Sequence, residues 1–352
     1  MGSIAPRAAV GIISIGDMGL GIAKLLQAYN YEVLTTTVGR SPSTHARATS
    51  AGITVLPSDG ALVEKADYIL SIVPPRDAVA TANRIIDAWT AASSSRSTPL
   101  YFLDLNAIAP STARSIDAAL TSRAPGIRFI DGGIIGSPPK LLDEEAAAAA
   151  PNSNTDADAD LTASLLRWKR PSIPISGPHA LDAANTTTTA PPPSGAHLAA
   201  ILNTKHLDPT IGPASGLKAC FAAMTKGFYA LALQSFTTAH GLGLLPELRA
   251  QLAASFPALA AAADRGAVGM QHKAYRWEGE MREVAETLRA EGGWGAAGQD
   301  AVFDGVAEVY RVVAEETGLG TEEGRKGEVE GVVGELAVAA AARRRDGGGK
   351  GE

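Results

Sequence analysis

The chain has 352 residues, a formal net charge of −6 and a pI near 5.6. This length suits two domains, and the acidic balance disfavours nucleic-acid binding, which needs a basic face. The single cysteine, Cys220, excludes a disulfide framework and a cysteine-based zinc site. No apolar run approaches the ~18 residues that span a bilayer, so we expect no membrane partner and a cytoplasmic protein. From the charge and the cysteine count we expect no nucleic-acid partner and no metal.

Short β-rich runs alternate with helical stretches in the first half of the chain. The helical stretches include 18–29 and 76–91, and the candidate strands are 8–14, 31–38, 53–56, 67–73, 99–104 and 127–135. Such alternation predicts parallel strands joined by right-handed crossovers. The sequence therefore predicts an α/β, doubly wound Rossmann-type sheet in an N-terminal domain over residues 1–205.

The composition changes around residue 140. Residues 144–160 and 183–195 are low in complexity, rich in Ala, Thr and Pro, and we expect them to be exposed insertions. A short strand is predicted between them at 173–176.

From residue 206 to 342 the sequence predicts an all-α C-terminal domain, and we expect the charged, glycine-rich tail 343–352 to be disordered. Two of its helices are predicted at 273–290 and 299–316. On a long helix that starts after Gly212, apolar residues recur at helical spacing and predict one core-facing stripe. Its members are Leu217, Phe221, Met224, Phe228 and Leu231.

A glycine fingerprint joins the first strand to the first helix. An apolar strand, a tight turn and a helix N-terminus together form an anion site for a dinucleotide pyrophosphate. The turn runs through Ser14, Ile15, Gly16, Asp17, Met18 and Gly19, with serine at the first glycine position. We expect this serine to be tolerated only if its φ stays below zero.

The end of the second strand indicates which nicotinamide cofactor binds. An NAD site needs a carboxylate there for the ribose hydroxyls, whereas this strand ends in Gly39, Arg40 and Ser41. The planar guanidinium of Arg40 can hold a 2′-phosphate, so the sequence favours NADP over NAD. An ordinary surface arginine is the alternative.

Three loops follow later strands on the edge that faces the ligand. The first contains Val73, Pro74 and Pro75, which we expect to lie against the cofactor, although prolines also simply end strands. We expect Asn106 in the second loop to contact both the cofactor and the substrate. We expect Gly136 and Ser137 in the third loop to bind a substrate carboxylate.

Lys218 is the candidate acid–base residue. It lies near the start of the long helix, where the helix dipole and partial desolvation favour acid–base chemistry. Thr225 and Lys226 follow within two turns and could border the same pocket. A solvated lysine on an alanine-rich helix is the alternative.

In this order and spacing, these motifs resemble the β-hydroxyacid dehydrogenase superfamily, which includes 6-phosphogluconate and 3-hydroxyisobutyrate dehydrogenases and the imine reductases. The C-terminal half looks like a poorly characterised branch with its own helical domain. The resemblance implies that Lys218 exchanges a proton with the substrate hydroxyl, and that the protein is a homodimer through its C-terminal helices. Ala222 stands where the family has asparagine, which leaves the substrate open.

The sequence thus predicts an NADP-dependent oxidoreductase that transfers hydride between nicotinamide and a small hydroxy or oxo acid. Imine reduction is a second hypothesis, which Lys218 disfavours because imine reductases generally lack this lysine. A non-catalytic NADPH-binding sensor or scaffold is the third.

Overall fold

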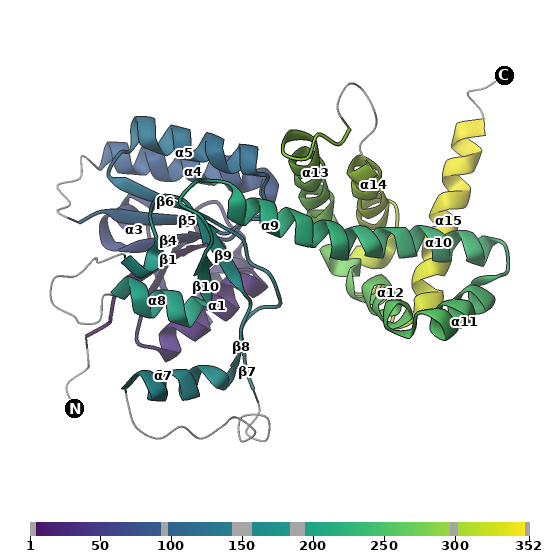
Figure 1. The fold of residues 1–352 in the computed structure, drawn as a ribbon, viewed down its shortest axis with the longest axis horizontal. Helices are drawn as coiled ribbons and strands as arrows, with labels where there is room; N and C mark the ends of the chain where they lie inside the picture. Colours follow the sequence, from purple (N-terminus) through teal and green to yellow (C-terminus); the bar gives the residue numbers. More distant parts are fainter. Residues whose placement is uncertain (1–4, 93–97, 143–156, 184–193, 296–301, 349–352) are drawn as a thin grey trace. The chain divides into compact units, whose positions relative to one another are not determined.

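The computed structural model describes residues 5–92, 98–142, 157–183, 194–295 and 302–348. Most of the two expected insertions therefore lies outside the described residues. The chain divides into two compact units, Met1–Lys218 and Ala219–Glu352. Figure 1 shows the two units, one built around a sheet and the other from helices.

The first unit is built on an eight-stranded sheet. Its strands are β1 (Ala9–Ile13), β2 (Glu32–Thr36), β3 (Thr54–Leu56), β4 (Tyr68–Ser71), β5 (Leu100–Asp104), β6 (Ile127–Gly132), β9 (Ile173–Ser176) and β10 (Thr204–His206). Their order is β10-β9-β6-β5-β4-β1-β2-β3. The seven predicted strands are present, and the fold class is confirmed.

The far edge of the sheet differs from a fully parallel arrangement. β9 runs antiparallel to β6, and β10, which the sequence did not predict, pairs parallel to β9. A separate antiparallel ribbon pairs β7 (Lys140–Leu141) with β8 (Trp168–Lys169). A three-residue strand such as β10 is too short to give a periodic signal.

Helices cover both faces of this sheet (Figure 1). One apolar core packs α1 (Asp17–Ala28), α2 (Pro42–Ser50), α7 (Ala157–Leu166) and α8 (Ser194–Leu202) against the sheet. The opposite core contains residues of α3 (Asp59–Lys65), α4 (Pro75–Ala91) and α5 (Pro110–Arg123). Strand residues such as Tyr68 and Phe102 are fully buried, as a sheet covered on both faces requires.

The second unit consists of packed helices. The boundary between the units falls within α9 (Pro213–Ala222), which leads through a π-helical segment, η2 (Ala223–Gly227), into α10 (Phe228–Gly241). The remaining helices are α11 (Leu245–Ser255), α12 (Pro257–Gly269), α13 (Ala274–Ala290), α14 (Val302–Glu315) and α15 (Val329–Gly348). The helices predicted at 273–290 and 299–316 correspond to α13 and α14. The tail expected to be disordered from residue 343 is helical as far as Gly348, because it continues α15.

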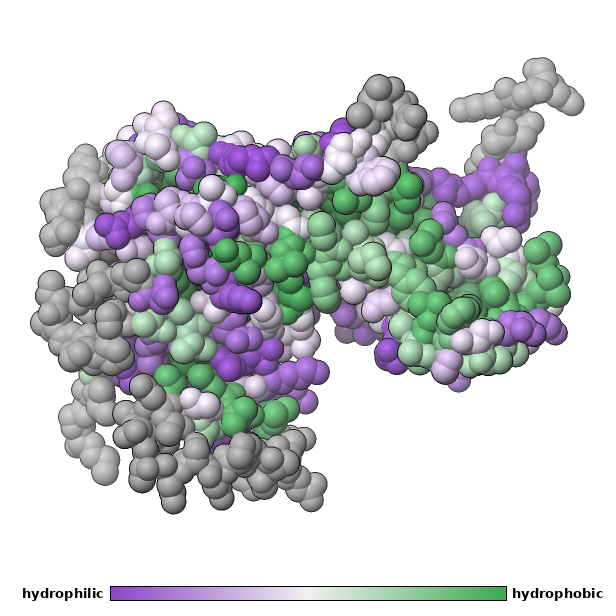
Figure 2. Space-filling model, in the orientation of Figure 1, coloured by the Kyte–Doolittle hydropathy of each residue, from purple (hydrophilic) through white to green (hydrophobic). Residues whose placement is uncertain are grey.

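The predicted core stripe of the long helix is wrong. Four of its five members are exposed, with exposed fractions of 45% at Leu217, 47% at Phe221, 80% at Met224 and 52% at Leu231. The alanine-rich side of α10, with Leu233 and Phe236, enters the core instead. Periodicity identifies an apolar face but not what covers it. Figure 2 shows apolar side chains in green along α10.

No described helix is long and apolar enough to cross a membrane.

Candidate functional site

The fingerprint turn has a strained backbone at its first position. Ser14 has φ +81°, in the left-handed region that glycine adopts freely. The expectation of a negative φ at Ser14 is therefore wrong. The chain keeps the geometry that a glycine gives this turn and accepts the strain of a side chain, which is typical of functional sites.

Gly16 and Gly19 have different roles in this turn. A Cβ on Gly19 would stand 2.1 Å from the Ser14 carbonyl oxygen, so this glycine allows α1 to approach the turn. At Gly16, no described heavy atom lies within 4 Å of the corresponding position. Gly16 precedes α1, and no described side chain caps this helix. Open space beside an uncapped helix N-terminus fits the pyrophosphate of a dinucleotide, to which Ile15, Asp17 and Met18 would offer backbone groups.

The loop after β2 presents cations and hydroxyls. Gly39 has φ +72°, Arg40 is exposed, and the Ser41 hydroxyl caps α2 by accepting from the Thr44 backbone N–H at 3.4 Å. Arg47 on α2, which no sequence motif marks, donates from its guanidinium to the Ile15 carbonyl at 2.8 Å. This contact ties α2 to the fingerprint turn, and only the tertiary structure reveals it.

Asn106 is buried and holds two neighbouring loops together. Its Oδ1 accepts from the Val73 backbone N–H at 2.6 Å, and its Nδ2 donates to Ser71 at 3.0 Å and to Asp104 at 2.8 Å. Only 3% of Asn106 is exposed. The amide predicted to contact the ligand is thus occupied in shaping the loop of Val73. Pro74 and Pro75 begin α4, as strand-ending prolines would.

Lys218 lies in the second turn of α9, against the loop that follows β6. A Cβ on Gly133 would stand 2.8 Å from the lysine Cβ, so only glycine admits the lysine stem there. The ammonium donates a hydrogen bond to the Ile134 carbonyl. The lysine is therefore half-buried, and its charged end is held at the carboxyl edge of the sheet.

The same loop continues toward the cofactor helix. Gly136 has φ +131°, and a Cβ there would approach Pro171, while Ser137 is exposed. Pro138 and Pro139 then pack against α1, within 3.0–3.1 Å of where a Cβ on Gly21 would stand. One loop thus connects the lysine contact with the helix whose N-terminus fits a pyrophosphate.

Thr225 and Lys226 belong to the second unit and interact with residues of that unit. The Thr225 hydroxyl donates to the Phe221 carbonyl at 2.9 Å. The Lys226 ammonium forms an ion pair with Glu280 and lies 5.0 Å from the centre of the Trp277 ring. Both residues fall in the π-helical segment, so a count of 100° per residue from Lys218 does not apply to them.

The fold and the turn at Gly16 define a Rossmann-type dinucleotide-binding protein. Residues 9–151 match the family described as the NAD binding domain of 6-phosphogluconate dehydrogenase, and residues 239–313 match a domain of unknown function, DUF1932. The chain therefore combines an NAD-binding domain of the 6-phosphogluconate dehydrogenase type with a DUF1932 domain. This confirms the resemblance found in the sequence.

Solved structures share the fold at low sequence identity. A conserved hypothetical protein from Sinorhizobium meliloti 1021 is 20% identical, with a TM-score of 0.57 and coverage of 95% of this chain and 97% of that one. The 3-hydroxyisobutyrate dehydrogenase of Mycobacterium tuberculosis is 15% identical, with a TM-score of 0.55 and coverage of 86% and 92%. A conserved protein reported as similar to 3-hydroxyacid dehydrogenases is 22% identical, with a TM-score of 0.55 and coverage of 87% and 96%. No curated protein matches the sequence.

Proposed function

We propose that the protein is an NADP-preferring oxidoreductase that interconverts a small hydroxy acid and its oxo acid, with Lys218 as the acid–base residue. The observation that carries this proposal is the loop from Gly133 to Pro139. One end of this loop receives the Lys218 ammonium at Ile134, and the other end packs on α1 beside the fingerprint turn. A substrate on this loop would meet both a proton-transferring group and the cofactor.

Each residue of the proposed site has a defined task in this chemistry. Bound NADP would accept or supply the hydride. The Lys218 amine takes the proton from the substrate hydroxyl during oxidation and returns it to the oxo oxygen during reduction. Ser137 and the backbone at Gly136 hold the substrate carboxylate, and Asn106 fixes the Val73 loop against the cofactor.

A substrate panel tests the reaction. We expect NADP-dependent turnover of at least one member of a panel of 2- and 3-hydroxy acids. Lys218→Ala should lower kcat by about 10²–10⁴-fold, the usual contribution of a general acid–base residue. Lys205→Ala, which removes an exposed lysine of β10, is the matched control and should keep full activity. Full activity in Lys218→Ala would overturn the assignment of this lysine.

The cofactor preference follows from the charges after β2. The sequence contains no carboxylate between Glu32 and Asp59, while Arg40 and Arg47 lie within that stretch. Arg40→Ala should weaken NADPH binding about tenfold or more, the value of a charge-assisted hydrogen bond, and leave NADH binding unchanged. Fluorescence titration measures both affinities. Tighter binding of NADH than of NADPH by the native protein would contradict the proposal.

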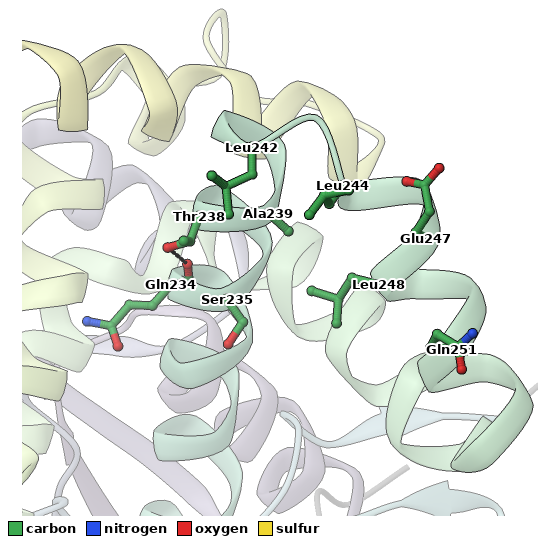
Figure 3. Close-up of a pocket in the computed structure, with 9 residues that line it drawn as sticks. All are labelled: Gln234, Ser235, Thr238, Ala239, Leu242, Leu244, Glu247, Leu248 and Gln251. Carbon is green, nitrogen blue, oxygen red and sulfur yellow. Dashed lines mark hydrogen bonds between the residues drawn. The ribbon is translucent and has the colours of Figure 1, made fainter.

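We also propose that the protein is a homodimer through the second unit. Two exposed members of the stripe on the long helix, Met224 in η2 and Leu231 in α10, continue toward Leu242, which directly follows α10 and is 68% exposed. There a groove of about 560 Å³ opens between α10 and α11, and Figure 3 shows Leu242, Leu244 and Leu248 lining it. An exposed apolar surface of this kind is typical of a protein interface.

Sedimentation tests the dimer. The native protein should sediment at about twice the chain mass, and Leu231→Glu should sediment as a monomer. Val338→Glu is the matched control, because Val338 is 68% exposed and lies on α15 rather than on the stripe. A native monomer would overturn the proposal.

Turnover separates the enzyme from the third hypothesis, a sensor or scaffold. The substitution of the family's asparagine by Ala222 supports that hypothesis. A protein that binds NADPH but oxidises no member of the panel, and reduces no oxo acid or imine, would favour it.

A further inference from the structure

A buried carboxylate at the end of β6 is not used by the chemistry proposed above. Asp131 has no exposed surface, and both of its oxygens accept hydrogen bonds. Oδ2 accepts from the Ser176 hydroxyl at 2.8 Å, from the Gly212 N–H at 3.0 Å and from the Ser215 N–H at 3.3 Å. Oδ1 accepts from the Ser215 hydroxyl at 2.5 Å. Burying an ionised carboxylate is costly unless such donors surround it.

Three of these four donors belong to the start of α9. Gly212 precedes the helix and Ser215 lies in its first turn, where backbone N–H groups have no partner within the helix. A second group, the Ser176 hydroxyl on β9, accepts from the Ala214 N–H at 3.0 Å. The first turn of α9 is therefore capped by the sheet rather than by its own sequence, and a carboxylate there also balances the helix dipole.

Lys218 follows Ser215 by three residues on the same helix. Its stem packs on Gly133, its ammonium reaches the Ile134 carbonyl, and these residues follow Asp131 by two and three positions in the chain. The segment that begins at Asp131 thus holds α9 at one point and the lysine at another. A shift of the first turn of α9 displaces the lysine from both contacts.

We propose that Asp131 is the positioning residue of the lysine site: with Ser176 and Ser215 it anchors α9 to the edge of the sheet and so sets where the Lys218 amine stands. This inference rests on the proposed function of Lys218. It assigns a task to a residue that never touches the substrate. The cost of misplacing a reacting group by about 1 Å reaches 100-fold in rate.

Ser215→Ala is the most informative variant, because it removes one hydrogen bond from Oδ1 and keeps the charge of Asp131. Ser58→Ala is the matched control. The Ser58 hydroxyl accepts from the Ala61 N–H at 3.1 Å and caps α3, so its loss removes a helix-capping bond elsewhere in the same unit. Asp131→Asn is a stronger perturbation, because an amide nitrogen would then face N–H or O–H donors.

The first measurement needs neither cofactor nor substrate. The full chain is labelled with acetic anhydride, and mass spectrometry follows the acetylation rate of Lys218. In Ser215→Ala this rate should rise toward that of Lys24, an exposed lysine of α1, because the amine is no longer held at the Ile134 carbonyl. It should stay at the native value in Ser58→Ala. An unchanged rate in both Ser215→Ala and Asp131→Asn would overturn the proposal.

The second measurement uses the best hydroxy acid of the panel. Ser215→Ala should lower kcat about tenfold or more and leave the NADPH affinity unchanged. In a Lys218→Ala background the same substitution should have no further effect, because a positioning residue acts only through the group it positions. Independent, multiplying effects would overturn the proposal. If Lys218→Ala alone is fully active, the proposed function fails, while the labelling experiment still decides whether Asp131 positions the lysine.

Discussion

The two glycines of the fingerprint turn should respond in opposite ways to the same substitution. In Gly19→Ala, the new Cβ would stand 2.1 Å from the Ser14 carbonyl oxygen and 3.4 Å from Ile12 Cγ2. Normal contact distances are about 3.5 Å, so α1 and the turn must separate by roughly 1.4 Å. The closest contact is with a backbone carbonyl oxygen, which cannot move aside as a flexible side chain could.

Gly19→Ala should lower the free energy of unfolding by about 3 kcal/mol or more, the upper end of the range for overpacked cores. For a unit of about this size, 1 kcal/mol lowers Tm by roughly 2–4 °C, so the melting temperature should fall by about 6–12 °C. In Gly16→Ala the new Cβ enters open space at φ −76° and ψ −171°, which alanine tolerates. Its cost should stay within about 1 kcal/mol, that of an ordinary helix cap.

Cofactor binding should show the reverse order of effects. The Cβ of Gly16→Ala occupies the space that we assign to the pyrophosphate, so the Kd for NADPH should rise about tenfold or more, or 1.4 kcal/mol. Thermal unfolding and NADPH fluorescence measure the two effects on the same samples. Native NADPH affinity in Gly16→Ala would refute the placement of the pyrophosphate. An unchanged melting temperature in Gly19→Ala would refute the tight contact between turn and helix.

Three further substitutions test other parts of the molecule. Ser14→Gly should raise the free energy of unfolding by up to about 1 kcal/mol in urea, because left-handed strain of about 1–2 kcal/mol exceeds the entropy that glycine loses; destabilisation would contradict this. Burial lowers the pKa of His197 from 6.5 to about 4. Between these pH values the unfolded chain binds a proton at His197 and the folded chain does not. The free energy of unfolding therefore falls by up to about 3 kcal/mol as the pH drops from 6.5 toward 4. His197→Asn, which keeps a hydrogen-bonding partner for the Tyr31 hydroxyl, should flatten that part of the pH–stability curve; an unchanged curve would contradict this. Glu280→Gln deprives the mostly buried Lys226 ammonium of its carboxylate and should cost about 3 kcal/mol, and an unchanged melting temperature would show that the pair contributes nothing.

Local patterns in the sequence were sufficient for the first unit. Apolar runs alternate with helical stretches, and central parallel strands such as β4 and β5 are buried along their whole length, so their pattern depends little on their neighbours. The start of α1 at the fingerprint and the start of α4 at Pro75 also follow from local chemistry, because glycine and proline restrict the backbone where they stand.

Other features depend on contacts between residues far apart in the chain, and the sequence could not show them. Asp131 precedes the loop of Gly136 and Ser137, to which the sequence assigned a substrate carboxylate, yet it caps a helix that begins 82 residues later, at Pro213. Asn106 looked like a ligand contact, yet its amide is saturated by neighbouring strand ends. A polar side chain that follows a strand can face a ligand or the protein, and only its partners distinguish the two.

By itself, the sequence determined the Rossmann-type class, the place of the fingerprint turn and the helical nature of the second unit. Each of these follows from residues that are close together in the chain: the spacing of apolar residues in strands and helices, and the glycines of the turn. The tertiary structure decided the positive φ of Ser14, the contact of Arg47 with Ile15 and the exposure of the apolar stripe on the long helix. The physical reason is the same in each case: strain, long-range hydrogen bonds and the burial of an apolar face depend on what else packs there.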